Sequence, residues 1–475
     1  MKLSELTIAQ ALAGLKERKF SCLELTYACL QKIRDVDNKI NAFITVCEDN
    51  AIKQAEKADK LLKEDKNIFS LKPLLGIPYS AKDVFCTKGV KITASSKILK
   101  NYVPQYDATS IKKLNQAGAI LLGKTNNDAF GFGSSTENSD FQITKNPWNL
   151  KKVPGGSSGG SAAAVICGMG LFSIAEDTGG SIRQPACFCS VSGIKVSYGR
   201  VSRYGVIAYG SSLDTIGTIG KEIKDLAYTL KIIAGKDKYD ATTLPIKVPD
   251  YLNKLNRLVK DIKIGVPKEY FGKGIDKEVK LAIKKAINKL ENYGIGVEEI
   301  SLPHTKYAIP AYYLAGISEV SANLARYDGI RYGETRDNFG PEVKRRIMLG
   351  TYALSSGYYD AYYKKAMQVR TLIKQDFDKA FNKIDVILAP VSPFPAFDIG
   401  EKADNPLAMW LADIYTVTIN PAGVPALAIP CGFTKNNLPI GMQLIGPQFT
   451  EDLLFRLGFV YQQLTNWHKK KPEIN

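Results

Sequence analysis

The spacing of the hydrophobic positions changes along the chain. Over residues 1–70, apolar residues recur every three or four positions among charged ones, which predicts helices. Ser21 followed by Glu24 fits a helix start with a capping box, and residues 48–64 predict a charged helix ahead of Pro73. Beyond Pro73, short apolar runs bounded by glycine or proline predict buried strands at 76–84, 119–123, 171–175 and 191–196.

Helical patterns separate these runs, at 110–117 and 161–168. A second alternation follows: strands at 262–266, 297–302, 385–389 and 426–430, and helical segments at 276–292, 305–383 and 450–465. This order predicts an α/β fold with a large mixed, mostly parallel sheet covered by helices on both faces. Because no low-complexity linker interrupts the chain, we expect one domain over 1–475. Within it we expect an N-terminal helical segment at 1–70, a core at 71–235, an α/β and helical insertion on the substrate side at 236–384, and a C-terminal part at 385–475 that returns to the core.

The composition is that of an ordinary soluble globular protein, apart from a formal charge of +17. The excess of lysine fits either a polyanionic partner such as RNA or a solvated surface, and no RNA-binding motif appears. The eight cysteines form no C-x-x-C pair and no metal site is expected, so we expect buried thiols in a reducing compartment. With no signal peptide and no apolar stretch long enough to span a membrane, the sequence predicts a cytoplasmic or organelle-interior protein.

Two glycine-flanked serines carry the candidate chemistry, in 154–161 and 177–186. Glycines let consecutive backbone N–H groups converge, so the amides from Thr178 to Ser181 predict a nest for an oxyanion, with Ser181 as the attacking group. A flexible surface turn is the alternative. The first segment lacks the lysine of a P-loop, which argues against a nucleotide site.

The base that would activate Ser181 is the next question, because the chain has only two histidines, His304 and His468, and neither lies near a second motif. Lys82 ends an apolar run, and a buried lysine can act as a base because desolvation disfavours the ammonium form. A solvated lysine at a strand end is the alternative for Lys82.

At these residues the chain resembles the amidase signature family. The matching stretches are 76–83, 154–161 and 177–186. The resemblance implies the amidase signature fold and a Ser-Ser-Lys triad, in which Ser181 is acylated, Ser157 relays the proton and Lys82 is the base. It also implies an oxyanion hole made by the backbone amides of Thr178, Gly179, Gly180 and Ser181.

Further stretches, most specifically 354–365, resemble the branch of this family that supplies ammonia to tRNA-dependent amidotransferases. That resemblance implies hydrolysis of glutamine and transfer of ammonia through a tunnel to a B subunit. The B subunit would bind ATP and Mg²⁺ and amidate Glu-tRNA(Gln), in some organisms also Asp-tRNA(Asn), and a C subunit would clamp the complex together. This chain itself would need no cofactor. In the glutamine pocket, Arg346 would bind the carboxylate and Asp413 the ammonium group, and Tyr312 would line the wall.

One departure is that Ala129 stands where the family commonly has glutamate, which bears on ammonia handling or on coupling to the B subunit. The tyrosines in 358–363 are expected to pack helices rather than to contact substrate. Two other functions stay open: a stand-alone amidase acting on another carboxamide, and a scaffold that only binds partners.

Overall fold

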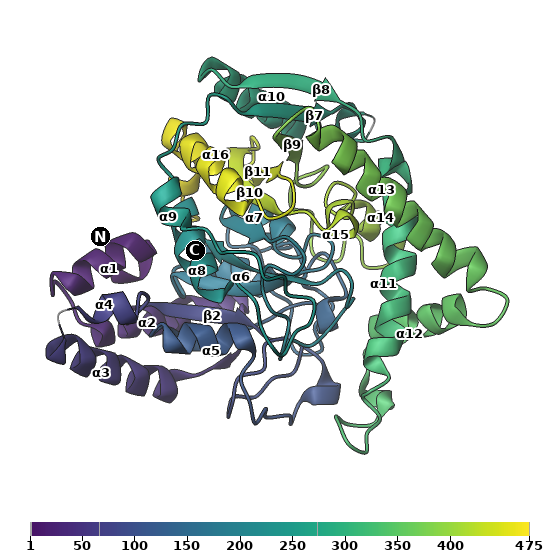
Figure 1. Ribbon diagram of the computed structural model, residues 1–475. Coiled ribbons are helices and arrows are strands. Elements are labelled where there is room, and N and C mark those ends of the chain that lie inside the picture. Colours follow the sequence, from purple (N-terminus) through teal and green to yellow (C-terminus); the bar gives the residue numbers. More distant parts are fainter. Residues whose placement is uncertain (1, 66, 273, 475) are drawn as a thin grey trace.

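A single sheet runs through the computed structural model, which describes residues 2–65, 67–272 and 274–474 (Figure 1). In this part of the chain the sheet has eleven strands, in the order β1-β3-β2-β4-β6-β5-β10-β11-β9-β7-β8. The strands are β1 Phe43–Val46, β2 Pro78–Lys82, β3 Ile120–Thr125, β4 Phe172–Asp177, β5 Ser192–Lys195, β6 Thr215–Gly220, β7 Lys263–Pro267, β8 Gly296–Ile300, β9 Val386–Pro390, β10 Ala426–Phe433 and β11 Pro439–Ile445.

The sheet is mixed, as the sequence predicts, but it is not mostly parallel. Among the described residues, parallel pairing is confined to β2 with β3 and β4 and to β7 with β8 and β9. The other six neighbouring pairs are antiparallel. The prediction failed on this point because it missed β1, β6 and β11, and each of these strands pairs only antiparallel with its neighbours.

Strand β6 shows why such a strand is hard to find. Its sequence, Thr-Ile-Gly-Thr-Ile-Gly, carries two glycines, which are uncommon in strand interiors. A Cβ on Gly217 would lie 1.8 Å from the carbonyl oxygen of Ile194 in β5. The glycine that hides the strand therefore allows the neighbouring backbone to approach.

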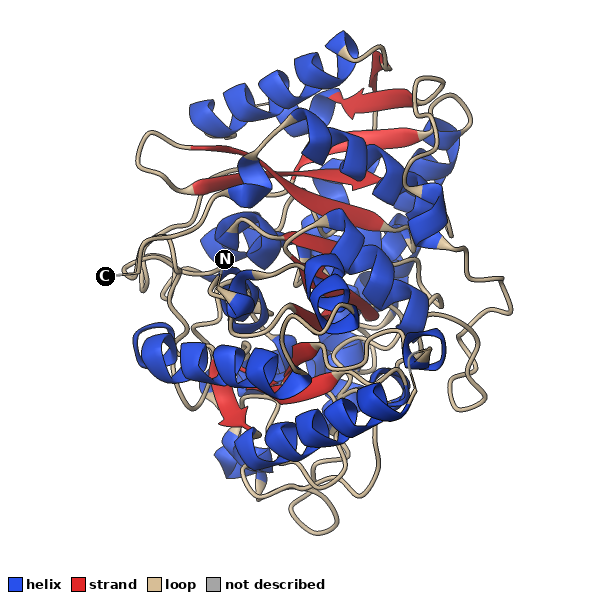
Figure 2. Ribbon diagram, turned by 90° about the vertical axis from the view of Figure 1, so that its left-hand side faces the viewer, coloured by secondary structure: helices blue, strands red, loops and turns tan. Residues whose placement is uncertain are grey.

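Helices surround the sheet, and Figure 2 shows them on both sides of the strands. The helix over 48–64 is found as predicted, and the Ser21–Glu24 capping box is confirmed. Helices α6 and α7 pack on each other and on the sheet, and so do α8 and α16. The helices are α1 Ile8–Lys16, α2 Cys22–Ile40, α3 Glu48–Glu64, α4 Ile68–Leu71, α5 Thr109–Gln116, α6 Gly159–Ile166, α7 Arg183–Cys189, α8 Ile223–Ile233, α9 Tyr251–Lys254, α10 Lys277–Asn292, α11 Ala308–Leu324, α12 Pro341–Leu354, α13 Lys365–Phe381, α14 Pro406–Leu411, α15 Ile419–Ala422 and α16 Glu451–Leu464.

Two features of this fold position the candidate site. The parallel neighbours β2 and β4 end at Lys82 and Asp177, so their carboxyl ends meet at one edge of the sheet. The helical insertion α11–α13 stands beside this region, on the right of Figure 1, and α11 packs against both α12 and α13. Over the described residues, no helix is both long enough and apolar enough to cross a membrane.

Candidate active site

The side chain of Lys82 is completely buried at the end of β2. Its Nζ donates hydrogen bonds to Ser157 Oγ and to Glu176 Oε2, both at 2.7 Å. The interpretation of Lys82 as a solvated lysine at a strand end is therefore wrong. The structure brings together two of the three predicted catalytic side chains and adds a carboxylate that the sequence did not point to.

Hydrogen bonds join the two glycine-rich segments, the one that contains Ser157 and the one that contains Ser181. The N–H of Ser158 donates to the carbonyl oxygen of Ser181 at 3.2 Å, and the N–H of Gly156 donates to Gln184 Oε1 at 3.0 Å. A Cβ on Gly156 would lie 2.4 Å from Asp128 Oδ2 and from the amide nitrogen of Ser135. The neighbouring backbone and carboxylate thus require glycine there.

The predicted nest begins directly after β4. Gly180 has φ of +138°, and a Cβ on it would lie 2.4 Å from Thr416 Oγ1. Its N–H donates to Asp177 Oδ1 at 2.9 Å, so Gly180 drops out of the four amides predicted to bind an oxyanion. Among the described residues, the N–H groups of Thr178, Gly179 and Ser181 have no hydrogen-bond partner, and of these three residues Gly179 and Ser181 line the cavity in front of Ser181.

Arg183 holds this loop from the first turn of α7. Its side chain is completely buried and binds Asp177 through two hydrogen bonds, from Nε at 3.0 Å and from Nη2 at 2.9 Å. Burial alone would raise the pKa of Asp177, but the charge and hydrogen bonds of Arg183 outweigh it and hold that pKa at about 2. Asp177 is therefore ionised, and it fixes the amides of Gly180 and Ile182.

A small cavity opens in front of Ser181, and Ser181 itself is 7% exposed. Every residue predicted from the resemblance to bind glutamine lines this cavity: Tyr312, Arg346 and Asp413. The Tyr312 hydroxyl oxygen would lie 2.4 Å from a Cβ on Gly179, so the ring of Tyr312 covers the nest. Residues from the loop after β4, from α11, from α12 and from the segment before α15 converge here, although they are far apart in the sequence.

Arg346 projects from α12 into the cavity, whereas its neighbour Arg345 binds Glu342 outside it. The Nε of Arg346 donates to Glu342 at 2.7 Å and Nη1 donates to Tyr209 Oη at 2.7 Å. The guanidinium also lies over the ring of Phe132, 5.2 Å from its centroid. Its Nη2 has no partner among the described residues, so this nitrogen can meet a substrate carboxylate.

Asp413 also lines the cavity and is 7% exposed. Its carboxylate accepts hydrogen bonds from the Ser134 hydroxyl, from Tyr313 at 3.2 Å and from Gln184 at 3.2 Å. Burial raises the pKa of Asp413 to about 7, although these hydrogen bonds and the nearby arginines oppose the shift. A bound cation would favour the ionised form.

Sequence reasoning missed a buried polar chain that starts at Lys82. Glu176 accepts from Lys82, the hydroxyl of Thr178 contacts carboxylate oxygens of both Glu176 and Asp214, and Asp214 accepts the N–H groups of Tyr209 and Gly210 at 2.9 Å. Burial, with the charge of Glu176, raises the pKa of Asp214 to about 7. The signal was present in the sequence, because an acidic residue inside the otherwise apolar run of β4 calls for a buried partner.

Other residues singled out in the sequence lie away from the cavity. His304 is half-buried and bound to Asp376 at 2.9 Å, and His468 is half-buried near the C-terminal end. Ala129 is buried at the start of a 3₁₀ turn whose last residue, Gly131, lines the cavity. Within the described residues all eight cysteines are free thiols, and all but Cys47 are buried.

The tyrosines of 358–363 pack on a helix in part, as expected, because the rings of Tyr358 and Tyr362 contact Tyr352 of α12. Tyr358 and Tyr359 are 40% and 45% exposed, and the ring of Tyr358 lies against Tyr352 and Tyr362 on the surface. A π-helix over Asp360–Lys364 carries part of this group. The rings contact each other because the turn between α12 and α13 stands away from the sheet.

Known proteins resemble this chain over its full length. The family model for amidases matches residues 24–455. The A subunit of glutamyl-tRNA(Gln) amidotransferase from Desulfatibacillum aliphaticivorans is 51% identical, with 100% of each chain covered. The protein of the same name from Geobacillus sp. (strain WCH70) is 50% identical, again with 100% of each covered. The crystal structure of the corresponding glutamyl-tRNA(Gln) amidotransferase chain from Thermotoga maritima is 39% identical and matches with a TM-score of 0.84, covering 100% of this chain and 99% of that one.

Proposed function

The chain belongs to the amidase family, and from this premise we propose that it is the glutamine-hydrolysing A subunit of a tRNA-dependent amidotransferase. The observation that carries the proposal is the cavity in front of Ser181, which holds Arg346 and Asp413 together. Free glutamine carries both a carboxylate and an ammonium group, so a pocket that selects it needs one group of each charge. A stand-alone amidase for simple amides would need neither.

The reaction that we propose proceeds through an acyl-enzyme. Ser181 Oγ attacks the side-chain amide carbon of glutamine, while its proton passes to Ser157 and the proton of Ser157 passes to Lys82. The N–H groups of Gly179 and Ser181 stabilise the negative charge on the former carbonyl oxygen. The proton returns through Ser157 to the leaving nitrogen, ammonia departs, and water hydrolyses the acyl-enzyme to glutamate.

The direct contact between Lys82 and Ser157 supports this order of proton transfers, because a base has to lie within hydrogen-bond reach of the proton it takes. Lys82 can accept a proton only as the neutral amine. Glu176 accepts a hydrogen bond from Lys82 Nζ at 2.7 Å and so holds the amine beside Ser157. The buried setting of these groups keeps water from competing for the proton.

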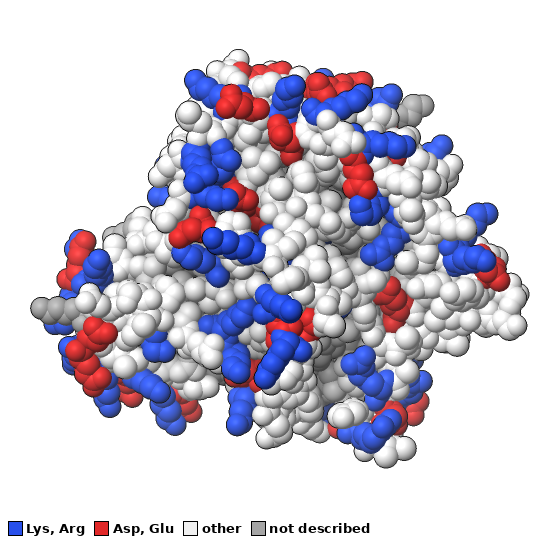
Figure 3. Space-filling view, viewed as in Figure 1, with Lys and Arg blue, Asp and Glu red and all other residues white. Residues whose placement is uncertain are grey.

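We further propose that the ammonia serves a B subunit, which binds ATP and Mg²⁺ and converts Glu-tRNA(Gln) to Gln-tRNA(Gln). A C subunit would complete the complex, in the cytoplasm or an organelle interior. The surface charge does not by itself require tRNA to bind this chain. On the face seen in Figure 3, lysine and arginine are interleaved with acidic residues rather than gathered in one continuous patch.

The test uses the complex of this chain with its B and C subunits. Ser181→Ala should abolish glutamine hydrolysis and glutamine-dependent amidation, while ammonium chloride still supports formation of Gln-tRNA(Gln). Loss of the ammonia-dependent reaction as well would count against the assignment. A wild-type chain that hydrolyses simple amides without partners, and shows no preference for glutamine, would favour the stand-alone amidase.

A further inference from the structure

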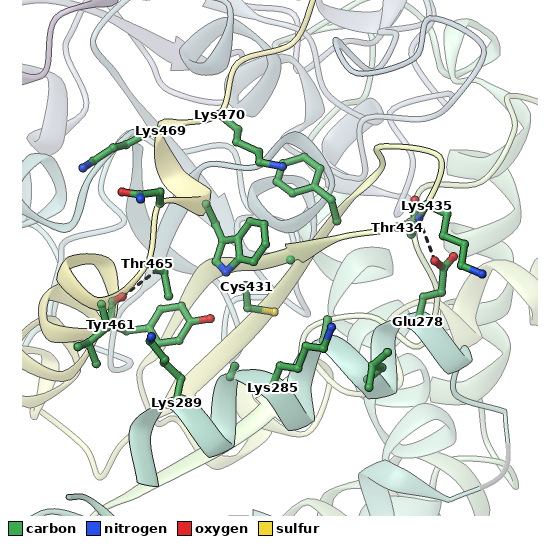
Figure 4. Close-up of a pocket in the computed structure, with 18 residues that line it drawn as sticks. Glu278, Lys285, Lys289, Cys431, Thr434, Lys435, Tyr461, Thr465, Lys469 and Lys470 are labelled. Carbon is green, nitrogen blue, oxygen red and sulfur yellow. Dashed lines mark hydrogen bonds between the residues drawn. The ribbon is translucent and has the colours of Figure 1, made fainter. Parts of the chain in front are cut away.

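A large cavity lies away from Ser181, between α10, the end of β10 and the C-terminal residues after α16 (Figure 4). Its volume is about 880 Å³, which falls in the range of ligand-binding clefts. Along α10, one face of the helix lines this groove from Glu278 to Lys289, and the segment from Trp467 to Lys470 forms the opposite wall. None of the proposed catalytic residues contributes to it.

The floor of the groove is apolar and leaves room for a bulky side chain. Ala282 and Ala286 of α10 and Cys431 of β10 are small and buried, and Figure 4 shows the Cys431 side chain facing the helix that carries Lys285 and Lys289. Tyr461 and Trp467 close the floor from the other side. Small residues facing aromatic ones form a receptacle for an aliphatic or aromatic side chain.

The rim of the groove is strongly basic. Five exposed lysines line it, and they come from α10, the turn after β10 and the C-terminal segment: Lys285, Lys289, Lys435, Lys469 and Lys470. The one acidic residue among the described lining residues is Glu278, whose carboxylate already accepts the N–H of Lys435 at 2.9 Å. Positive charges on both sides of an apolar cleft add up to a positive electrostatic potential inside it, which attracts a negatively charged partner.

The rings in the groove are poorly placed to stack on nucleic acid bases. Phe433 packs against Trp148 with ring centroids 4.8 Å apart, and Lys470 lies 4.5 Å from its centroid. Lys470 also lies 5.2 Å from the ring of Trp467. Single-stranded nucleic acids are bound by free aromatic faces, and these faces are occupied.

From this combination we propose that the groove docks an acidic, amphipathic segment of the partner subunits of the amidotransferase. Apolar side chains of that segment enter the floor, and its carboxylates meet the lysines of both walls. The inference rests on the proposed function, because it takes the B and C subunits as the source of the segment. It adds the place of contact and its chemistry.

The experiment compares two double variants of one helix in the full complex. Lys285→Glu with Lys289→Glu reverses two groove lysines, and Lys277→Glu with Lys284→Glu makes the same charge change on α10 outside the groove. The chain is titrated with purified B and C subunits, and the dissociation constant is measured at low and high salt. We expect the groove variant to bind about tenfold more weakly at low salt, with a reduced dependence on salt, and the control variant to bind like wild type.

Three other outcomes would overturn the inference, and they differ from one another. If the groove variant and the control variant bind the B and C subunits with the same dissociation constant, the groove is not the docking site, while the proposed function stands. Normal binding of B and C with loss of tRNA from the complex assigns the groove to nucleic acid instead. Failure of the wild-type chain to bind B and C at all removes the proposed function together with the inference.

Discussion

Replacing Arg183 by methionine tests how the nest is held. The substitution removes the two hydrogen bonds to Asp177 and those to Thr416, Gln443 and Asn420, all in a completely buried site. Asp177 has a pKa of about 2 in place of 3.8, and this shift corresponds to ~2 kcal/mol. Since breaking a buried ion pair by removing one partner typically costs about 3–5 kcal/mol, we expect a loss of this size in the free energy of unfolding at pH 7.

The loss should also depend on pH in a defined direction. Because the pKa of Asp177 is depressed in the folded state, its favourable contribution is present above the unfolded value and disappears as the pH falls through about 2. In the variant the Asp177 carboxylate is buried without its counter-charge, which destabilises the folded state. Protonation of this carboxylate at low pH removes the destabilisation. The difference in unfolding free energy between wild type and Arg183→Met should therefore shrink as the pH falls, and the wild-type contribution to it should be lost between about pH 4 and pH 2.

Urea unfolding followed by circular dichroism measures the loss in the free energy of unfolding. A matched variant shows whether a change in kcat comes from lower stability alone. Arg200 is 2% exposed and binds Glu451, outside the cavity. Arg200→Met should lose comparable stability but keep its kcat for glutamine under folding conditions. Arg183→Met should lower kcat at least tenfold, because the N–H donors of the nest lose their support. A stability loss below about 1 kcal/mol, or an equal fall in kcat for both variants, would refute the reasoning.

Three further predictions concern the cavity. Because the pKa of Asp413 is about 7, the KM for glutamine should rise ~10-fold as the pH falls from 8 to 6, and a KM just as pH-dependent in Asp413→Asn would contradict this. Glu176→Leu should lower kcat at least tenfold with little change in KM, and Glu176→Gln, which keeps an acceptor oxygen for Lys82, should retain more activity; equal rates for the two would argue against a role for that contact. Gly180→Ala should lower kcat/KM at least tenfold and reduce Tm because of the positive φ and the close Thr416 hydroxyl, whereas Gly296→Ala, with open space around it, should leave both unchanged; an active, stable Gly180→Ala protein would show that the loop can adjust.

The sequence placed the local parts of the site and missed those that depend on distant partners. Ser181 and Lys82 stand in segments whose glycines and apolar runs mark them, whereas Ser157 is distinguished from the other serines of 154–161 only by the family resemblance. Glu176 and Asp214 come together only because β4 pairs antiparallel with β6. That pairing is long-range, and no periodicity in either strand encodes it.

The residues that line the cavity come from different parts of the chain. Ser181 belongs to the sheet core, whereas Arg346 comes from α12 in the helical insertion. In the reaction that we propose, the core supplies the nucleophile and its proton relay, and within this relay Lys82 is buried and hydrogen-bonded to both Ser157 and Glu176. The insertion supplies Arg346 and the C-terminal part supplies Asp413, the two residues that we propose distinguish glutamine from a simple amide. On this proposal, the reacting groups and the substrate-binding groups come from different parts of the chain, and a glutamine bound in the cavity would contact both.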